Sequence, residues 1–151
     1  EFSFSLPILT IDQKKRKLLD EKIKMSHHLS KELLAISITI SFGPSQMNSS
    51  WMAKFGISVA PMIAANLLRS TDVAYYFKEK SLLFLLIMGC KNEHVATIVK
   101  RIEQALVSYI EEISQEPGTK LVCAQALYPQ DAESSAGLIE LLNKGSQQII
   151  Q

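Results

Sequence analysis

Apolar and polar positions recur with different periods along the chain, and each change of period marks a new element. Residues 12–31 are mostly polar, with apolar side chains spaced as on one helical face, and Asp12 is the expected N-cap. Residues 33–42 are rich in β-branched side chains and alternate Ile with Ser or Thr from Ile36, which predicts a strand. The rest of the pattern predicts a helix, a β-hairpin, a helix, a strand and a final helix. Their expected bounds are 51–68, 73–77 paired with 82–88, 94–113, 120–128 and 132–150.

Proline and N-cap residues refine the expected bounds of the helices. Pro61 lies inside the first helix after the opening strand, which predicts a kink or two separate helices. The final helix is expected to begin at an N-cap of Ser134 or Ser135. Without the two terminal helices, the order of elements is β-α-β-β-α-β. This order predicts an α+β fold of the ferredoxin-like or palm type, an antiparallel sheet with helices packed on one face.

Length and composition limit the function classes. The 151 residues suffice for about one domain, divided here into a leading segment and helix (1–31) and a single domain (32–151). A net charge of +1 argues against DNA or RNA as a partner, which would require clustered basic charge. The longest apolar run, 82–90, is too short to span a bilayer. A start at Glu1 rather than Met is expected for a fragment of a longer chain.

Cys90 and Cys123 lie in apolar surroundings without metal-ligand spacing. We expect two buried thiols in a reducing compartment rather than a disulfide.

Acidic residues are sparse where this topology usually holds metals. Nucleotidyl-transferring palm domains need carboxylates on the first strand and at the hairpin tip to hold two divalent cations. The first strand here offers only the hydroxyls of Ser37, Thr39 and Ser41. The tip carries one acid, Glu79, between two lysines. The pattern therefore predicts no metal site and no metal-dependent phosphoryl transfer.

A pair of opposite charges stands between the first core helix and the second strand. Arg69 and Asp72 are three residues apart, six residues before the hairpin tip. An arginine fork can bind the O6 and N7 acceptors of guanine, and a carboxylate can accept the guanine N1 and N2 hydrogens. The alternative is a local ion pair on the surface, worth little to stability. For His94, near a helix start, we expect a capping or surface role.

Residues 71–86, TDVAYYFKEKSLLFLL, resemble without a gap the SD-x-x-ARYGGDEF-x-x-LL region of GGDEF domains, the diguanylate cyclase family. Downstream, ALYPQD at 126–131 is similar to the A-x-YPxD stretch of that family. Leu9-Thr10 resembles its entry motif, and residues 54–56, KFG, resemble its YGH. The resemblance spans most of the chain and implies a GGDEF-like fold.

Departures from the family pattern imply a degenerate member. The signature hairpin becomes KEKSL at 78–82, the glycines that let GTP approach are replaced by bulky side chains, and the first-strand metal aspartate aligns near Thr39. The resemblance therefore implies an inactive diguanylate cyclase. Arg69 and Asp72, however, match the Arg-x-x-Asp inhibitory site, which binds cyclic di-GMP. Lys100 and Arg101 are the candidates for the second basic group of that site, and Arg101 is the better suited to stacking on a guanine.

The resemblance implies a bacterial, cytoplasmic cyclic di-GMP receptor without a cofactor, which binds a stacked ligand dimer and signals to a neighbouring domain or partner. The domain is expected to be the cytoplasmic part of a longer protein, with attachment to a membrane and a homodimer both left open. Two alternatives stay open. One is a protein-interaction module that has lost every ligand and uses the terminal helices. The other keeps GTP as an allosteric effector, with Lys78 or Lys80 near its phosphates.

Overall fold

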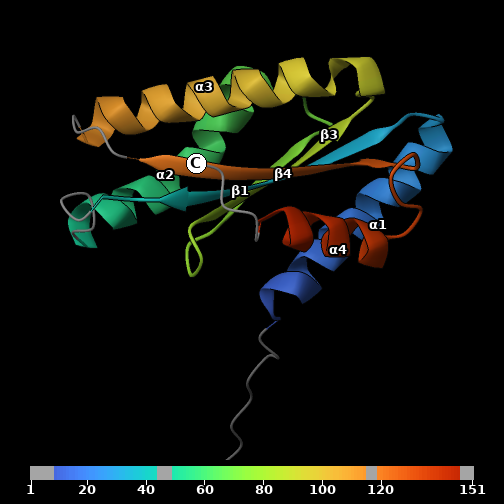
Figure 1. Ribbon diagram of the computed structural model, residues 1–151, viewed down its shortest axis with the longest axis horizontal. Helices are drawn as coiled ribbons and strands as arrows, with labels where there is room; N and C mark the ends of the chain where they lie inside the picture. Colours follow the sequence, from blue (N-terminus) through green and yellow to red (C-terminus); the bar gives the residue numbers. More distant parts are fainter. Residues whose placement is uncertain (1–8, 44–48, 115–118, 147–151) are drawn as a thin grey trace, which may run out of the picture.

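The computed structural model describes residues 9–43, 49–114 and 119–146. It contains a four-stranded antiparallel sheet with helices on both faces (Figure 1). The elements in chain order are α1 (Ile11–Leu29), β1 (Leu33–Ser41), α2 (Ser49–Leu67), β2 (Val73–Phe77), β3 (Leu82–Met88), the 3₁₀ turn η2 (Asn92–His94), α3 (Val95–Ser114), β4 (Lys120–Tyr128) and α4 (Ser135–Ser146). This order confirms the α+β fold that the hydrophobic pattern predicts.

The strand order is β2-β3-β1-β4, so β1 and β3 occupy the centre of the sheet. Leu33 of β1 pairs with Met88 of β3 and with Tyr128 of β4. The hairpin pairs Phe77 with Leu82 across its tip. Because β3 runs antiparallel to both β1 and β2, the strands β1 and β2 are parallel and separated by β3, as in a split βαβ unit.

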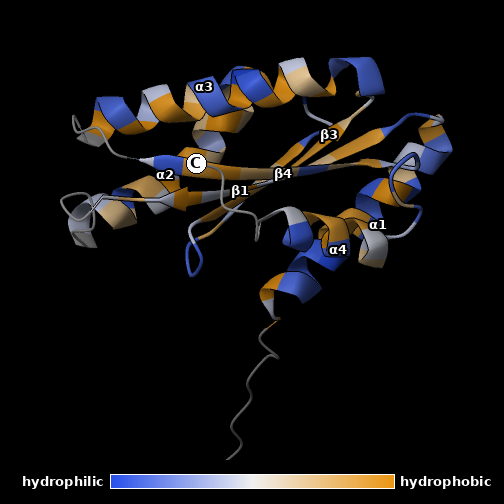
Figure 2. Ribbon diagram, viewed as in Figure 1, coloured by the Kyte–Doolittle hydropathy of each residue, from blue (hydrophilic) through white to orange (hydrophobic). Residues whose placement is uncertain are grey.

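Two hydrophobic cores lie on opposite faces of the sheet. Alternate residues of β3 divide between them, because successive side chains of a strand point to opposite faces. Leu83, Leu85 and Ile87 pack with α2 and α3, whereas Phe84 and Leu86 pack with α1 and α4. Figure 2 shows the apolar stripes of the helices turned toward the sheet. The terminal helices therefore cover the face that a bare βαββαβ unit leaves open.

Several boundaries differ from the sequence-based expectations. Helix α1 is capped by Thr10 rather than Asp12, since the Thr10 hydroxyl accepts from Gln13 N and the Gln13 side chain accepts from Thr10 N. Helix α2 is a single helix that contains Pro61, so the two-helix alternative is wrong. The hairpin strands and β4 have the predicted bounds. Ser134 accepts from Gly137 N at the start of α4, and the predicted helical residues 147–150 lie outside the described residues.

Among the described residues, no helix combines the length and the apolarity that crossing a bilayer requires.

Candidate functional site

The link between α2 and β2 is held by the carboxylate of Asp72. One of its oxygens accepts a hydrogen bond from Met88 N at 2.8 Å, and the other accepts from Arg69 N at 2.9 Å. The side chain is 2% exposed. Asp72 N in turn donates to Arg69 O at 3.0 Å. The carboxylate thus ties this link to the end of β3, so the alternative of a local surface ion pair does not describe Asp72.

Arg69 extends from the same link over the end of β3. Its Nε lies 3.6 Å from Asp72 Oδ2, and its Nη2 donates to Met88 O. The side chain is nevertheless 64% exposed, and Nη1 has no hydrogen-bond partner among the described residues. The guanidinium is therefore held in position on one side and open on the other, an arrangement that suits a planar acceptor edge.

A cavity of about 280 Å³ opens beside this arginine. Its polar side chains come from the α2–β2 link, from η2 and from α3, and its walls come from β3 and both core helices. The lining residues are Leu67, Arg69, Asp72, Ile87, Gly89, Cys90, His94, Ile98, Arg101 and Ile102. The structure therefore places Arg69, Asp72 and Arg101, three of the four site residues proposed from the sequence, around one cavity.

Lys100 lies elsewhere. It lines a separate depression with Glu103, Gln104 and Val107 of α3. Adjacent residues of a helix point in different directions, so Lys100 and Arg101 cannot both face the Arg69 cavity. Of the two basic candidates on this helix, only Arg101 is at the site.

His94 belongs to the cavity although sequence analysis gave it only a capping or surface role. The spacing contained the signal: His94, Ile98 and Arg101 are at positions i, i+4 and i+7, which share one helical face. A neutral imidazole offers one donor and one acceptor. His94 thus adds a further polar side chain to those of Arg69, Asp72 and Arg101.

Gly89 and Cys90 form the floor where β3 ends. Gly89 has φ +76°, which glycine adopts without strain, and an added Cβ would lie 3.9 Å from Arg69 Nη2. Burial raises the pKa of the Cys90 thiol, an effect that nearby Glu32 reinforces and Arg69 opposes. The cavity therefore contains a neutral thiol rather than a nucleophilic thiolate at neutral pH.

The hairpin tip offers a different chemistry. Lys78, Glu79 and Lys80 are all exposed. Within 9–43, 49–114 and 119–146, no group of three or more His, Cys, Asp or Glu side chains could hold a metal ion.

Cys123 is partly buried and donates to Glu103 at 3.2 Å, so burial and this neighbour raise its pKa. Both cysteines are free thiols.

No protein-family model and no curated protein matches the sequence. Solved structures with the same fold do exist. A DGC protein from Thermotoga maritima is 15% identical, with a TM-score of 0.65 over 85% of this chain and 88% of that one. The GGDEF domain of YfiN from Pseudomonas aeruginosa is 16% identical, with a TM-score of 0.64 over 87% of this chain and 83% of that one. The chain has the fold of a GGDEF domain.

The FimX GGDEF domain from Pseudomonas aeruginosa adds a third similar structure, 12% identical, with a TM-score of 0.64 over 86% of this chain and 82% of that one. Identities this low establish the fold alone. The GGDEF-like architecture predicted from the residues around the hairpin is thereby confirmed, and the roles of individual residues stay predictions.

Proposed function

We propose that this GGDEF-like domain is a non-catalytic receptor for cyclic di-GMP. The observation that carries the proposal is the convergence of Arg69 and Arg101 on one cavity, although they lie on different elements and 32 positions apart in the sequence. Two guanidinium groups with a histidine beside them suit a ligand that combines guanine bases with phosphates.

Arg69 is the proposed base-reading group. Its open side is suited to the O6 and N7 acceptors of a guanine, whereas its other side is fixed by Met88 O and Asp72. Because the Asp72 carboxylate is 2% exposed and already accepts from two backbone amides, its role in the proposal is to position Arg69. Arg101, which is exposed, would contact a phosphate or stack on a base.

The cavity is small for such a ligand. Its volume of about 280 Å³ is slightly below the roughly 300–1,000 Å³ typical of pockets that enclose a drug-sized molecule. One guanine would enter it, and the remainder of the ligand would lie across the rim. A second cyclic di-GMP molecule could then stack on the outer face of the first, as expected for a bound dimer.

Catalysis is not part of the proposal. Diguanylate cyclase chemistry needs two metals beside the substrate phosphates. The hydroxyl-bearing first strand and the single acid Glu79 at the hairpin tip do not offer the carboxylates for that task. The domain would signal by binding the ligand with different affinity in two states of an adjacent domain or partner.

Calorimetric titration of the full chain with cyclic di-GMP tests the proposal, and the neighbouring residues of α3 supply a matched pair. Arg101→Ala is expected to weaken binding about tenfold or more, because it removes a charge-assisted contact. Lys100→Ala removes the same charge one residue away, in a different depression, and is expected to leave affinity unchanged. Absence of binding, or equal affinities of the two variants, would refute the proposal.

Exposed apolar side chains on the terminal helices favour a second candidate, a module that only contacts other proteins. Met25, Leu29 and Leu141 are large hydrophobic residues exposed on α1 and α4. Two results together would establish this candidate instead: no heat in the titration with cyclic di-GMP, and a stable complex with another protein that Leu29→Ser abolishes.

A further inference from the structure

The hydrogen bonds of Asp72 limit which edge of a base the Arg69 cavity can read. A free carboxylate could accept the N1 and N2 hydrogens of guanine, the role that the sequence suggests for this residue. In the structure one carboxylate oxygen accepts from Met88 N and the other from Arg69 N, and the side chain is 2% exposed. A base in the cavity therefore has no access to the carboxylate, and its N1 and N2 hydrogens gain no acceptor from Asp72.

The guanidinium of Arg69, in contrast, still has donors to offer. Its Nη2 donates one hydrogen to Met88 O, whereas Nη1 has no hydrogen-bond partner among the described residues. Nη1 and the second hydrogen of Nη2 are left for a ligand, and two neighbouring N–H groups of a guanidinium match a pair of acceptors. Guanine and hypoxanthine present such a pair, O6 and N7, whereas adenine presents one acceptor and one donor at the same edge.

The floor and the walls of the cavity leave space for a flat ring system beside this arginine. A Cβ built on Gly89 would lie 3.9 Å from Arg69 Nη2, so the glycine keeps that side of the guanidinium clear. The apolar side chains of Ile87, Ile98 and Ile102 line the cavity. Because apolar contacts are non-directional, these walls hold a base without distinguishing one purine from another.

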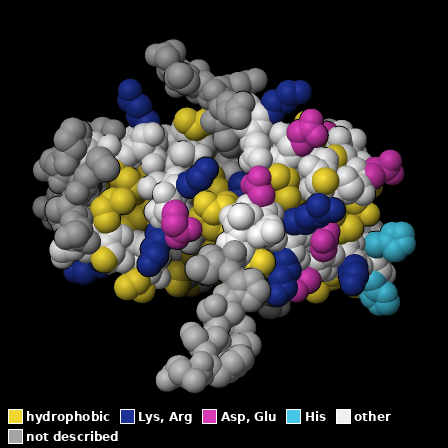
Figure 3. Space-filling view, turned by 90° about the horizontal axis from the view of Figure 1, so that it is seen from below, with side chains coloured by type: hydrophobic (Ala, Val, Ile, Leu, Met, Phe, Trp, Pro, Cys, Tyr) yellow, Lys and Arg dark blue, Asp and Glu magenta, His cyan; other side chains and the backbone are white. Residues whose placement is uncertain are grey.

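Charge does not distinguish among cyclic dinucleotides either. Arg101 is exposed on α3, and its proposed contact is with a phosphate or with the face of a base. All cyclic dinucleotides carry the same phosphates, and every base has a π face. Figure 3 shows Lys and Arg side chains interspersed among Asp and Glu on the face of α1 and α4, so that face adds no general attraction. Discrimination between bases is therefore left to Arg69.

We propose that the cavity accepts any cyclic dinucleotide with at least one 6-oxopurine base, whose O6 and N7 are read by Arg69 alone. This inference rests on the proposed receptor function and specifies its ligand class. The 2-amino group of guanine is not read, and the second base, which lies across the rim, can be guanine or adenine. The cavity volume of about 280 Å³ suits one base rather than two.

Calorimetric titrations of the full chain with four ligands of the same phosphodiester ring test this specificity. They are cyclic di-GMP, cyclic di-IMP, cyclic di-AMP and the mixed ligand with one guanine and one adenine. Cyclic di-IMP, which lacks only the 2-amino groups, is expected to bind within about threefold of cyclic di-GMP. The mixed ligand should bind about twofold more weakly, because it has one suitable base instead of two. Cyclic di-AMP should bind about tenfold more weakly or worse, since its N6 donor faces the donors of Arg69.

The two arginines of the cavity supply a matched pair of variants. Arg69→Ala is expected to lower the affinity for cyclic di-GMP to that for cyclic di-AMP, so the preference for a 6-oxopurine disappears. Arg101→Ala removes the same charge from an exposed position and should weaken all four ligands by one factor, which keeps the preference. Loss of the preference in both variants, or in neither, would overturn the role given to Arg69.

Asp72→Asn tests the carboxylate separately from its effect on the fold. Affinities are expected to fall together, because the link that positions Arg69 is weakened, while the ratio between cyclic di-GMP and cyclic di-IMP stays as in the wild type. A wild-type preference for cyclic di-GMP over cyclic di-IMP of about tenfold, abolished by Asp72→Asn or by His94→Ala, would assign the reading of the 2-amino group to that residue and overturn the proposal. If Asp72→Asn does not fold, the wild-type ligand series decides alone.

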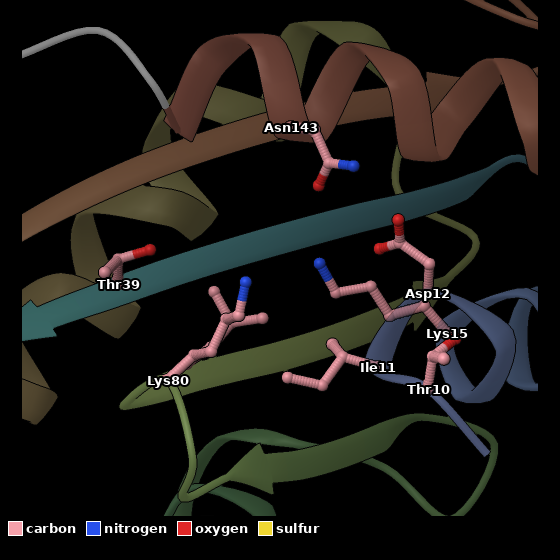
Figure 4. A pocket seen from close by; sticks show the side chains of 8 residues that line it. Thr10, Ile11, Asp12, Lys15, Thr39, Lys80 and Asn143 are labelled. Carbon is pink, nitrogen blue, oxygen red and sulfur yellow. The ribbon is translucent and has the colours of Figure 1, made fainter.

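A larger cavity on the opposite face of the sheet calls for a control on the place of binding. Its volume is about 670 Å³, and Figure 4 shows Lys15 of α1 and Lys80 of the hairpin tip directed into it. Lys80 does not line the Arg69 cavity, so Lys80→Met should leave all four affinities unchanged. A fall in all four would place the ligands in the other cavity and overturn the assignment.

The ligand series also separates this inference from the receptor function on which it rests. If cyclic di-GMP binds, but cyclic di-IMP or the mixed ligand binds about tenfold more weakly or worse, the inference fails and the receptor function stands. Equal affinities for cyclic di-GMP and cyclic di-AMP would have the same consequence. If none of the four ligands binds, both proposals fail.

Discussion

Two buried charged side chains, those of Asp72 and Lys15, differ in their hydrogen bonding. At the end of β3, the buried carboxylate of Asp72 accepts from two backbone amides and lies near the Arg69 guanidinium. On the other face, the buried ammonium of Lys15 has no hydrogen-bond acceptor among the described residues. A charge that is fully hydrogen-bonded helps to fix the fold, whereas one that is merely desolvated reduces stability until a partner arrives.

This difference changes how motifs should be interpreted. Arg69 and Asp72 form a recognisable pair in the sequence, yet half of the pair is used to join α2, β2 and β3. Lys15 belongs to no motif, yet among the described residues it is the charged residue that is buried, and it has no hydrogen-bond acceptor there. A residue that is already bound by the backbone positions a site, and a residue without a partner is available to a ligand.

The largest expected effect concerns Asp72. Replacing it with Ala leaves the amides of Met88 and Arg69 without their acceptor and should lower the free energy of unfolding by about 2–3 kcal/mol. Urea denaturation measures this loss. Asp72→Asn, which keeps one acceptor oxygen, should lose less. A loss below about 0.5 kcal/mol for Asp72→Ala would mean that the carboxylate does not hold the link.

Replacing Lys15 should change the free energy of unfolding in the opposite direction. Lys15→Met removes a desolvated charge and keeps an apolar stem against Phe84, so we expect the free energy of unfolding to rise by about 1–2 kcal/mol. Lys17→Met, on the exposed side of α1, should change it little. If Lys15→Met destabilised the fold as strongly as Asp72→Ala, the contrast between these two buried charges would disappear.

Gly89 tests the backbone beside Arg69. Ala at this position must adopt φ +76°, so Gly89→Ala should cost about 1 kcal/mol in the thermal or urea unfolding of the protein. Its Cβ would also stand near Arg69 Nη2, and cyclic di-GMP affinity should fall. Unchanged stability would show that the end of β3 can relax.

The smallest expected effect is on the pH dependence of the free energy of unfolding. The pKa of Lys15 is lowered in the folded protein, chiefly by burial, from the ordinary value of 10.5. Between the two values the unfolded chain binds more protons, so wild-type stability rises with pH across that window. The advantage of Lys15→Met should therefore shrink as the pH is raised from about 7 to about 10.

Measuring the difference between the two proteins isolates Lys15. Burial and Glu103 raise the pKa of Cys123, so this thiol lowers the free energy of unfolding of the protein as the pH rises above 9.0, the ordinary pKa of a thiol. Cys123 is present in both proteins, and its contribution cancels in the difference. An advantage that stayed constant with pH would show that Lys15 ionises as it does in water.

Much of the architecture follows from local pattern. The hairpin and β4 have the predicted bounds because apolar, β-rich runs end at charged or turn-forming residues. Arg101 was preferred to Lys100 only because a guanidinium is better suited to stacking on guanine. The i, i+4, i+7 spacing of His94, Ile98 and Arg101 identifies the face that contributes to the cavity. The N-cap was predicted at Asp12 instead of Thr10, because the capping box depends on a reciprocal bond with Gln13.

The sequence by itself determined the order of the elements and the placement of Arg69 and Asp72 at one link. These properties depend on period and spacing. Only the tertiary structure decided that Asp72 is bound by the backbone of β3, and that Lys15, in a run of four basic residues, is the one that is buried. Burial of a charge depends on which distant elements cover it, and here β3 and α4, both far from α1 in the sequence, pack against α1.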